Sequence, residues 1–176
     1  MNFKNTLVAL IVAAAAASTA GTAIGQTTAS QKFTVTVPGA IAITAPSNVT
    51  IVHDETETDQ VFPAQAWVVK GNSLAGVTAS FATSQAFRHT VDPNARRDAS
   101  LGLSVNSSVG SAAWTVGQAT DTTDYANNDG IATVQVSSNG FGRANLDLSV
   151  SFVTNGFGSF PAGDYETTVT GTVTAN

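Results

Sequence analysis

The sequence predicts an almost all-β fold with about nine to eleven short strands, at the spacing that is typical of an antiparallel β-sandwich. Thr, Ser, Val, Ala, Gly and Asn dominate the composition, whereas Lys, Glu and Leu, the usual residues of surface helices, are scarce. Apolar and polar residues alternate in many short runs, and Gly, Pro or Asn residues separate these runs. Both observations favour strands over helices.

The clearest alternation lies in the last third of the chain, from Gly142 to Asn176. Apolar residues of one parity occupy the run before the Gly- and Pro-containing stretch 155–164, and a second such run follows it. We expect these runs to form a long antiparallel hairpin that closes the molecule. Its inward residues should share one core: Leu146, Leu148, Val150, Phe152, Tyr165, Val169 and Val173.

Shorter alternating runs precede this hairpin. They predict strands near residues 31–37, 41–43, 49–52, 61–70, 77–81, 86–91, 101–105, 114–116 and 131–137. Trp67 and Trp114 lie in apolar strand contexts, which favours a place in the core over a sugar-binding platform. Pro93 after Asp92 predicts one helical turn over residues 92–98.

The first residues have the features of a secretory signal peptide. Lys4 supplies a positive charge, residues 7–17 form an uninterrupted apolar run, and small residues follow up to Gly25. We therefore expect residues 1–25 to be removed and residues 26–176 to form a single β-sandwich domain. The protein is expected in the periplasm, at the cell surface or in the extracellular medium. The apolar run is shorter than a membrane-spanning helix, so no membrane insertion is expected.

Charge and cysteine content exclude several classes of function. The chain carries seven basic and twelve acidic residues, and its basic residues are scattered, so nucleic acid is not an expected partner. Cysteine is absent, which excludes disulfide scaffolds, thiol catalysis and cysteine-based metal sites.

Two segments carry a family resemblance. The closing sequence Pro161-Ala162-Gly163-Asp164-Tyr165, followed by the Thr-rich stretch up to Thr174, resembles the last hairpin of exported bacterial β-sandwich proteins of the fimbrial-subunit and spore-coat-protein-U type. The segment from Trp67 to Phe81 is similar to their central strand-turn-strand unit. The resemblance covers about a quarter of the exported chain. It implies an immunoglobulin-like sandwich in a surface fibre, coat or matrix.

One loop has the composition of a cation site. Its oxygen-bearing side chains could gather around Ca²⁺, which accepts irregular sets of oxygen ligands. The spacing is not that of an EF-hand, and Asn-Asn-Asp-Gly before Ile131 is also a signal for a tight turn into a strand. The candidate metal ligands are Asp121, Asp124, Asn127 and Asp129. No other cofactor is expected.

The remaining polar groups give no catalytic constellation. His53 and Asp54 lie in the acidic stretch 53–59, which is typical of a solvated loop. His89, Asp92 and Ser100 could be combined into a catalytic triad, but no nucleophile motif surrounds any serine. We therefore expect no enzymatic activity. The expected function is that of a noncatalytic structural or adhesive surface subunit, and the alternative is a binding module that recognises a glycan or Ca²⁺ through its end loops.

The segment from Gln26 to Val37 leaves two hypotheses about assembly. Phe33, Val35 and Val37 would be buried only if the segment pairs with a sheet. We expect it to be the first strand of its own sandwich. Alternatively, it completes the sheet of a neighbouring copy, since strand addition to an open edge uses the same backbone hydrogen bonds and leads to self-association.

Overall fold

The computed structural model describes residues 27–176. The predicted signal peptide, residues 1–25, lies outside the described residues. The described chain divides into two units, one ending at Thr36 and the other comprising Val37–Asn176. All of the strands belong to the second unit.

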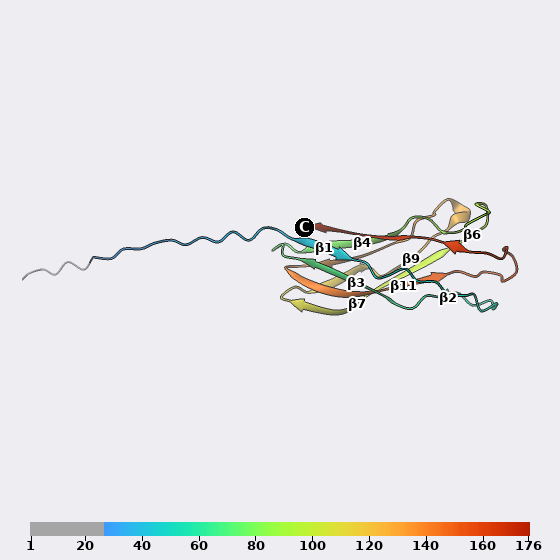
Figure 1. Cartoon of the computed structure of the whole chain (residues 1–176), viewed down its shortest axis with the longest axis horizontal. Coiled ribbons are helices and arrows are strands. Elements are labelled where there is room, and N and C mark those ends of the chain that lie inside the picture. Colours follow the sequence, from blue (N-terminus) through green and yellow to red (C-terminus); the bar gives the residue numbers. More distant parts are fainter. Residues whose placement is uncertain (1–26) are drawn as a thin grey trace, which may run out of the picture. The chain divides into compact units, whose positions relative to one another are not determined.

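Residues 37–176 form an all-β sandwich, as the composition predicts (Figure 1). The described residues contain more strands than expected because several are only two or three residues long. A single 3-10 helix, η1 (Tyr125–Asn127), interrupts them. The strands are β1 (Ile41–Thr44), β2 (Gln60–Val61), β3 (Gln65–Gly71), β4 (Val77–Thr83), β5 (Phe87–His89), β6 (Arg96–Arg97), β7 (Ala99–Gly110), β8 (Trp114–Gln118), β9 (Thr120–Thr122), β10 (Thr133–Ser138), β11 (Gly142–Phe152), β12 (Tyr165–Glu166) and β13 (Val169–Ala175).

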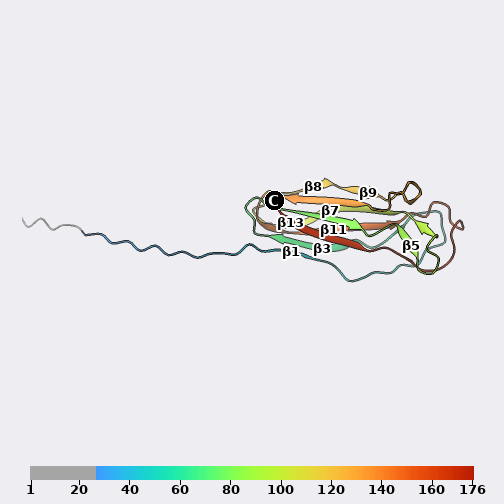
Figure 2. The ribbon, with the colours of Figure 1, turned by 90° about the horizontal axis from the view of Figure 1, so that it is seen from above.

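The strands form three antiparallel sheets. Sheet A has the order β1-β3-β11-β7-β9, with β2 paired to the end of β11. Sheet B has the order β13-β4-β10-β8, and the small sheet C has the order β12-β5-β6. Figure 2 shows β8 and β9 following one another along one side of the sandwich, with β13, β3 and β1 toward the other side.

The core lies between sheets A and B. Trp67 of β3 packs edge-on against Phe81 of β4, with 5.1 Å between the ring centroids. Gly171 of β13 permits this close packing, because a Cβ there would lie 2.6 Å from Ile43 Cδ1 and 2.8 Å from Trp67 Cζ3. Apolar side chains of alternate parity from both sheets fill the rest: Val69, Leu101, Leu103, Leu146 and Leu148 from sheet A, and Val77, Ala79, Val134 and Val136 from sheet B.

The predicted parity of the last third is confirmed, but the predicted closing hairpin is wrong. Leu146, Leu148, Val150 and Phe152 are buried, and Tyr165, Val169 and Val173 pack against the same core. However, β11 pairs with β3 and β7 in sheet A, whereas β13 pairs with β4 in sheet B. The reason is that residues 153–164 lead from sheet A to β12 of sheet C instead of folding a tight turn, and the chain then enters sheet B as β13.

Three other local expectations differ from the structure. Residues 27–40 and 49–52 contain no strand, and Phe33, Val35 and Val37 are 83%, 87% and 75% exposed, so the expected intramolecular first strand is wrong. Residues 92–98 form a turn followed by β6 instead of a helical turn, since Ala95 donates its N–H to Asp92 O and His89 donates to Ala95 O. The hydrogen bonds of the turn lead the chain directly into antiparallel pairing with β5.

The two ends of unit 37–176 meet at one end of the sandwich. Asn176 donates its N–H to Gly76 O, and Ile41 at the start of β1 pairs with Gly71 of the same turn region. The C-terminus is marked beside β1 in Figure 1. No helix in the part of the chain that the structure describes is long and apolar enough to cross a membrane.

Phe152 provides a direct test of the core. Its side chain is 7% exposed and contacts the rings of Phe87, Phe160 and Tyr165 at centroid distances of 5.3–5.6 Å. We expect Phe152→Ala to lower the free energy of unfolding by about 3 to 5 kcal/mol, because it removes an aromatic ring from a packed cluster. Urea denaturation of the two proteins measures this difference. A loss below about 1 kcal/mol would contradict the described packing.

Candidate functional site

The candidate site lies at the end of the sandwich away from the C-terminus, which we call the loop end. It consists of sheet C and of the four connecting segments 53–59, 92–95, 124–130 and 153–164. The register of sheet C sorts its side chains onto two faces. Phe87, His89 and Arg97 are buried on the inner face. Cross-strand register places Glu166, Arg88 and Arg96 in one row across the outer face.

The inner face of sheet C carries an aromatic cluster that fixes the segment 153–164. Phe160 lies 5.6 Å from Phe152 and 5.8 Å from Tyr165, measured between ring centroids. Tyr165 donates its hydroxyl proton to Pro161 O over 2.9 Å. Burial raises the pKa of the Tyr165 hydroxyl, while the positive charge of Arg97 opposes this shift. The cluster therefore anchors the long connection between sheets A and C by apolar contact.

Arg97 is a buried cation that has no acidic partner within residues 27–176. Its side chain is 8% exposed, and its guanidinium carbon lies 4.4 Å from the centroid of the Phe160 ring. The guanidinium donates hydrogen bonds to Tyr125 Oη over 3.3 Å and to Ser159 Oγ, while Nε has no partner among the described residues. No carboxylate oxygen of the described chain lies within 4.0 Å of it. A π face and neutral oxygens thus take the place of a counter-ion.

Both histidines of the chain accept backbone N–H groups at Nδ1 and bond to a second segment through Nε2. His89 Nδ1 accepts from the N–H groups of Val91 and Asp92, so Nε2 carries the proton and donates to Ala162 O. His53 Nδ1 accepts from Glu55 N–H, and His53 Nε2 donates to Thr154 Oγ1, whose own proton goes to a backbone carbonyl. Each ring therefore connects two segments of the loop end through its two nitrogens.

The acidic stretch 53–59 is tied to the same end of the sandwich. His53 stacks on Phe157 with 5.2 Å between centroids, and Glu57 accepts a hydrogen bond from Phe157 N–H. Asp54 accepts hydrogen bonds from the hydroxyl and the N–H of Thr56, which hold the pKa of its carboxyl below the ordinary value. The carboxylates of Asp54 and Glu57 therefore form hydrogen bonds that hold the loop end together.

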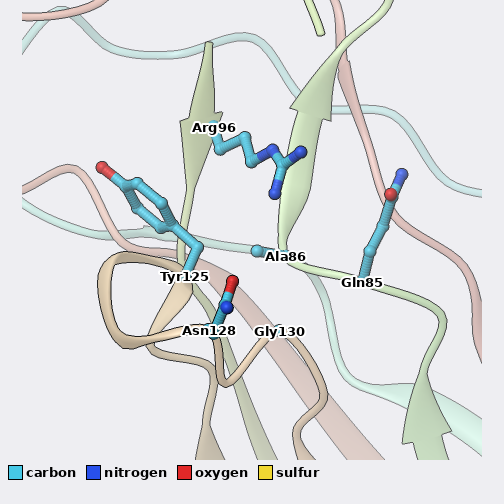
Figure 3. A pocket seen from close by; sticks show the side chains of 6 residues that line it. All are labelled: Gln85, Ala86, Arg96, Tyr125, Asn128 and Gly130. Atoms are coloured by element: carbon cyan, nitrogen blue, oxygen red, sulfur yellow. The ribbon is translucent and has the colours of Figure 1, made fainter. Parts of the chain in front are cut away.

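A small hollow of about 100 Å³ opens beside the outer face of sheet C (Figure 3). Arg96 extends into it between Tyr125 and Gln85, and Asn128 borders it from the opposite loop. A second, wider hollow of about 410 Å³ adjoins Arg88 and Glu166, and Gln85 borders both hollows. The two hollows thus present arginine and amide groups and the Tyr125 ring along one surface.

The candidate calcium ligands serve a turn and its neighbouring strand. Asp124 caps η1, since its two carboxylate oxygens accept hydrogen bonds from Asn127 N–H and Asn127 Nδ2. Asp121 accepts from Thr122 N–H and Thr133 N–H, and Asp129 exchanges backbone hydrogen bonds with Asp124. Within residues 27–176, no three acidic or histidine side chains are close enough to hold a metal ion. Calcium binding stays a prediction that this geometry does not favour.

The groups considered for catalysis are not brought together. Ser100 Oγ accepts a hydrogen bond from Thr122 Oγ1, and Asp92 accepts from Asn94 N–H. His89 contacts the backbone N–H of Asp92, as described above, and not its carboxylate. Ser100, His89 and Asp92 therefore bond to different groups and do not form a triad in this structure.

The sequence-based prediction missed Arg88 and Arg96. A signal was present, because three of the seven basic residues lie within residues 88–97. Their convergence depends on the turn 92–95, which places Arg96 directly opposite Arg88. The Asp92-Pro93 pair favours a helical turn instead, so the sequence alone does not place the two arginines opposite one another.

No family model, no curated protein and no solved structure matches the chain.

Substitution of Asp124 tests whether the loop 121–130 is only a turn or also a calcium site. We expect Asp124→Ala to destabilise the protein by about 1 kcal/mol, because it removes the side-chain cap of η1. The melting temperature of the unchanged protein should be the same in millimolar Ca²⁺ and in chelator. A calcium-dependent rise that disappears in the Asp124→Ala, Asp129→Ala double variant would establish the metal site instead.

Proposed function

We propose that this protein is a noncatalytic, exported structural or adhesive subunit of a surface fibre, coat or matrix. Its copies associate by strand addition, in which residues 31–37 of one copy pair with an open sheet edge of the next. The observation that carries the proposal is the exposed alternating segment before β1. Phe33, Val35 and Val37 share one parity and are each at least three-quarters exposed.

Burial of this segment would release a substantial free energy. Covering a Phe or Val side chain is worth roughly 1.5 to 3 kcal/mol. The intervening Thr34 and Thr36 are polar, so the segment has one apolar and one polar face when extended. A strand with two such faces suits the edge of a half-buried sheet, where one face covers the core and the other meets solvent.

The edge formed by β13 is the acceptor that the fold favours. β13 pairs with β4 along Val169–Ala175, and no other described strand pairs with it. Its inward residues Val169, Gly171 and Val173 remain only half-buried. An added strand would continue sheet B and cover these residues, and residues 31–37 match the length of β13.

The opposite side of the sandwich is less suitable. There the chain leaves sheet B after β8 and enters sheet A as β9, with Leu103 N–H bonded to Ala119 O at the crossing. One nearly continuous stretch thus spans both sheets on that side, which leaves a shorter free edge.

The test uses the exported chain, residues 26–176, and a matched pair of variants. Phe33→Asp, Val35→Asp places two charges on the apolar face of the segment, whereas Thr34→Asp, Thr36→Asp places the same charges on its polar face. We expect the first variant to be a folded monomer and the second to associate like the unchanged protein. Light scattering after size exclusion measures the mass, and electron microscopy shows whether fibres form.

Deletion of residues 26–37 supplies the second arm of the test. The shortened protein should melt cooperatively as a monomer and should bind a synthetic peptide of residues 31–38. The proposal fails if the full exported chain is a monodisperse monomer at all concentrations. It also fails if the deletion abolishes cooperative melting, because the segment would then belong to its own domain.

A further inference from the structure

The outer face of sheet C holds two arginines in an arrangement that costs stability. Arg88 and Arg96 are direct cross-strand partners in the β5–β6 pair. Like charges directly opposite one another on a sheet are destabilising. Neither guanidinium has a carboxylate oxygen within 4.0 Å among residues 27–176, although Glu166 is the cross-strand neighbour of Arg88 on the other side. The pair therefore lacks a compensating anion within the described chain.

Amide and aromatic side chains surround this arginine pair. Gln85 and Asn128 contribute side-chain amides to the hollow around Arg96, and the half-buried Tyr125 contributes a ring (Figure 3). Gln85 also borders the wider hollow that contains Arg88. The surface is thus an open strip along which cationic, amide and aromatic groups follow one another, and it is not a closed pocket for a small molecule.

We propose that this strip binds a carboxylated polysaccharide, a polymer that contains uronic acid residues. Arginine recognises a planar carboxylate through two parallel hydrogen bonds. The two arginines of the strip therefore offer binding positions for two carboxylates of one polymer. Amide side chains can both donate to and accept from sugar hydroxyls, and a tyrosine ring can cover the apolar face of a sugar. The role is additional to assembly and does not depend on it.

Charge density favours a polyuronate over a phosphate polymer. The chain as a whole has a net charge of −5, and Glu166 lies in the same hollow as Arg88. A densely charged polymer would meet this repulsion at many positions, whereas a uronate chain carries one carboxylate per sugar and offers hydroxyl groups between them. The two arginines could bind the carboxylates of such a chain, and the amides of Gln85 and Asn128 could bind its hydroxyl groups.

The experiment measures binding of a galacturonate tetramer to the exported chain by titration calorimetry. The fully methyl-esterified tetramer and inorganic polyphosphate serve as ligand controls. We expect Arg88→Ala and Arg96→Ala each to weaken tetramer binding by about tenfold, the factor for loss of one charge-assisted contact. Glu166→Gln should strengthen binding severalfold, because it removes the one carboxylate that borders the hollow of Arg88.

Arg143 provides the matched protein control. It is an exposed arginine on β11, near the opposite end of the sandwich, so Arg143→Ala changes the net charge equally but should leave binding unchanged. Arg143→Ala and Glu166→Gln should melt at the temperature of the unchanged protein, since their side chains are exposed. Arg88→Ala and Arg96→Ala should melt at that temperature or slightly above it, because each removes the like-charge cross-strand pair. The Phe33→Asp, Val35→Asp variant should bind the tetramer normally, which separates this proposal from the assembly proposal.

Three results would overturn the inference. The first is no binding of the galacturonate tetramer to the unchanged protein. The second is equal weakening by Arg143→Ala and by the two loop-end variants, which would indicate attraction to net charge alone. The third is tighter binding of polyphosphate than of the tetramer, which would assign the strip to phosphate polymers.

Discussion

The structure depends on the two-sided pairing of β11. This strand bonds to β3 along one edge and to β7 along the other, and its inward side chains Leu146 and Leu148 are almost fully buried beneath sheet B. Because both of its edges are occupied, β11 fixes the order of sheet A, and its alternation decides which face of that sheet is apolar. No disulfide supports this arrangement, since the chain contains no cysteine. Backbone ladders and core packing therefore carry the stability of residues 37–176.

The loop end shows how a sandwich can hold long connections without regular structure. Segment 153–164 has few backbone partners, and it is fixed by the Phe160 ring, by the Tyr165 hydroxyl and by Arg97. The burial of one guanidinium beneath an aromatic ring leaves Arg96, its chain neighbour, directed outward, because successive residues of a strand face opposite sides. The same two-residue strand thus supplies an internal anchor and an external cation.

Alternation predicted the buried faces well and the strand partners poorly. The period of two identifies Val150 and Phe152 as inward residues wherever their strand lies, since burial depends on side chains alone. Pairing depends on backbone groups that are the same in every strand, so the sequence favoured a hairpin between neighbours that in fact belong to different sheets. The same ambiguity applies to residues 31–37, whose alternation suits an internal strand and an added one equally. The proximity of Arg88 and Arg96 is not predicted by alternation, because it depends on the turn at residues 92–95.

The position of β13 has a consequence for the order in which the sheets are completed. Its partner β4 is complete at Thr83, yet the β13 ladder reaches Ala175, and Asn176 makes a further bond to Gly76. A chain that is synthesised from its N-terminus therefore carries β4 with one edge unpaired until residues 169–175 have been added. Sheet B cannot be completed before that stage, although β4 and β10 are already present. Shortened products that lack the final residues would retain an open, apolar edge and would be prone to aggregation and proteolysis.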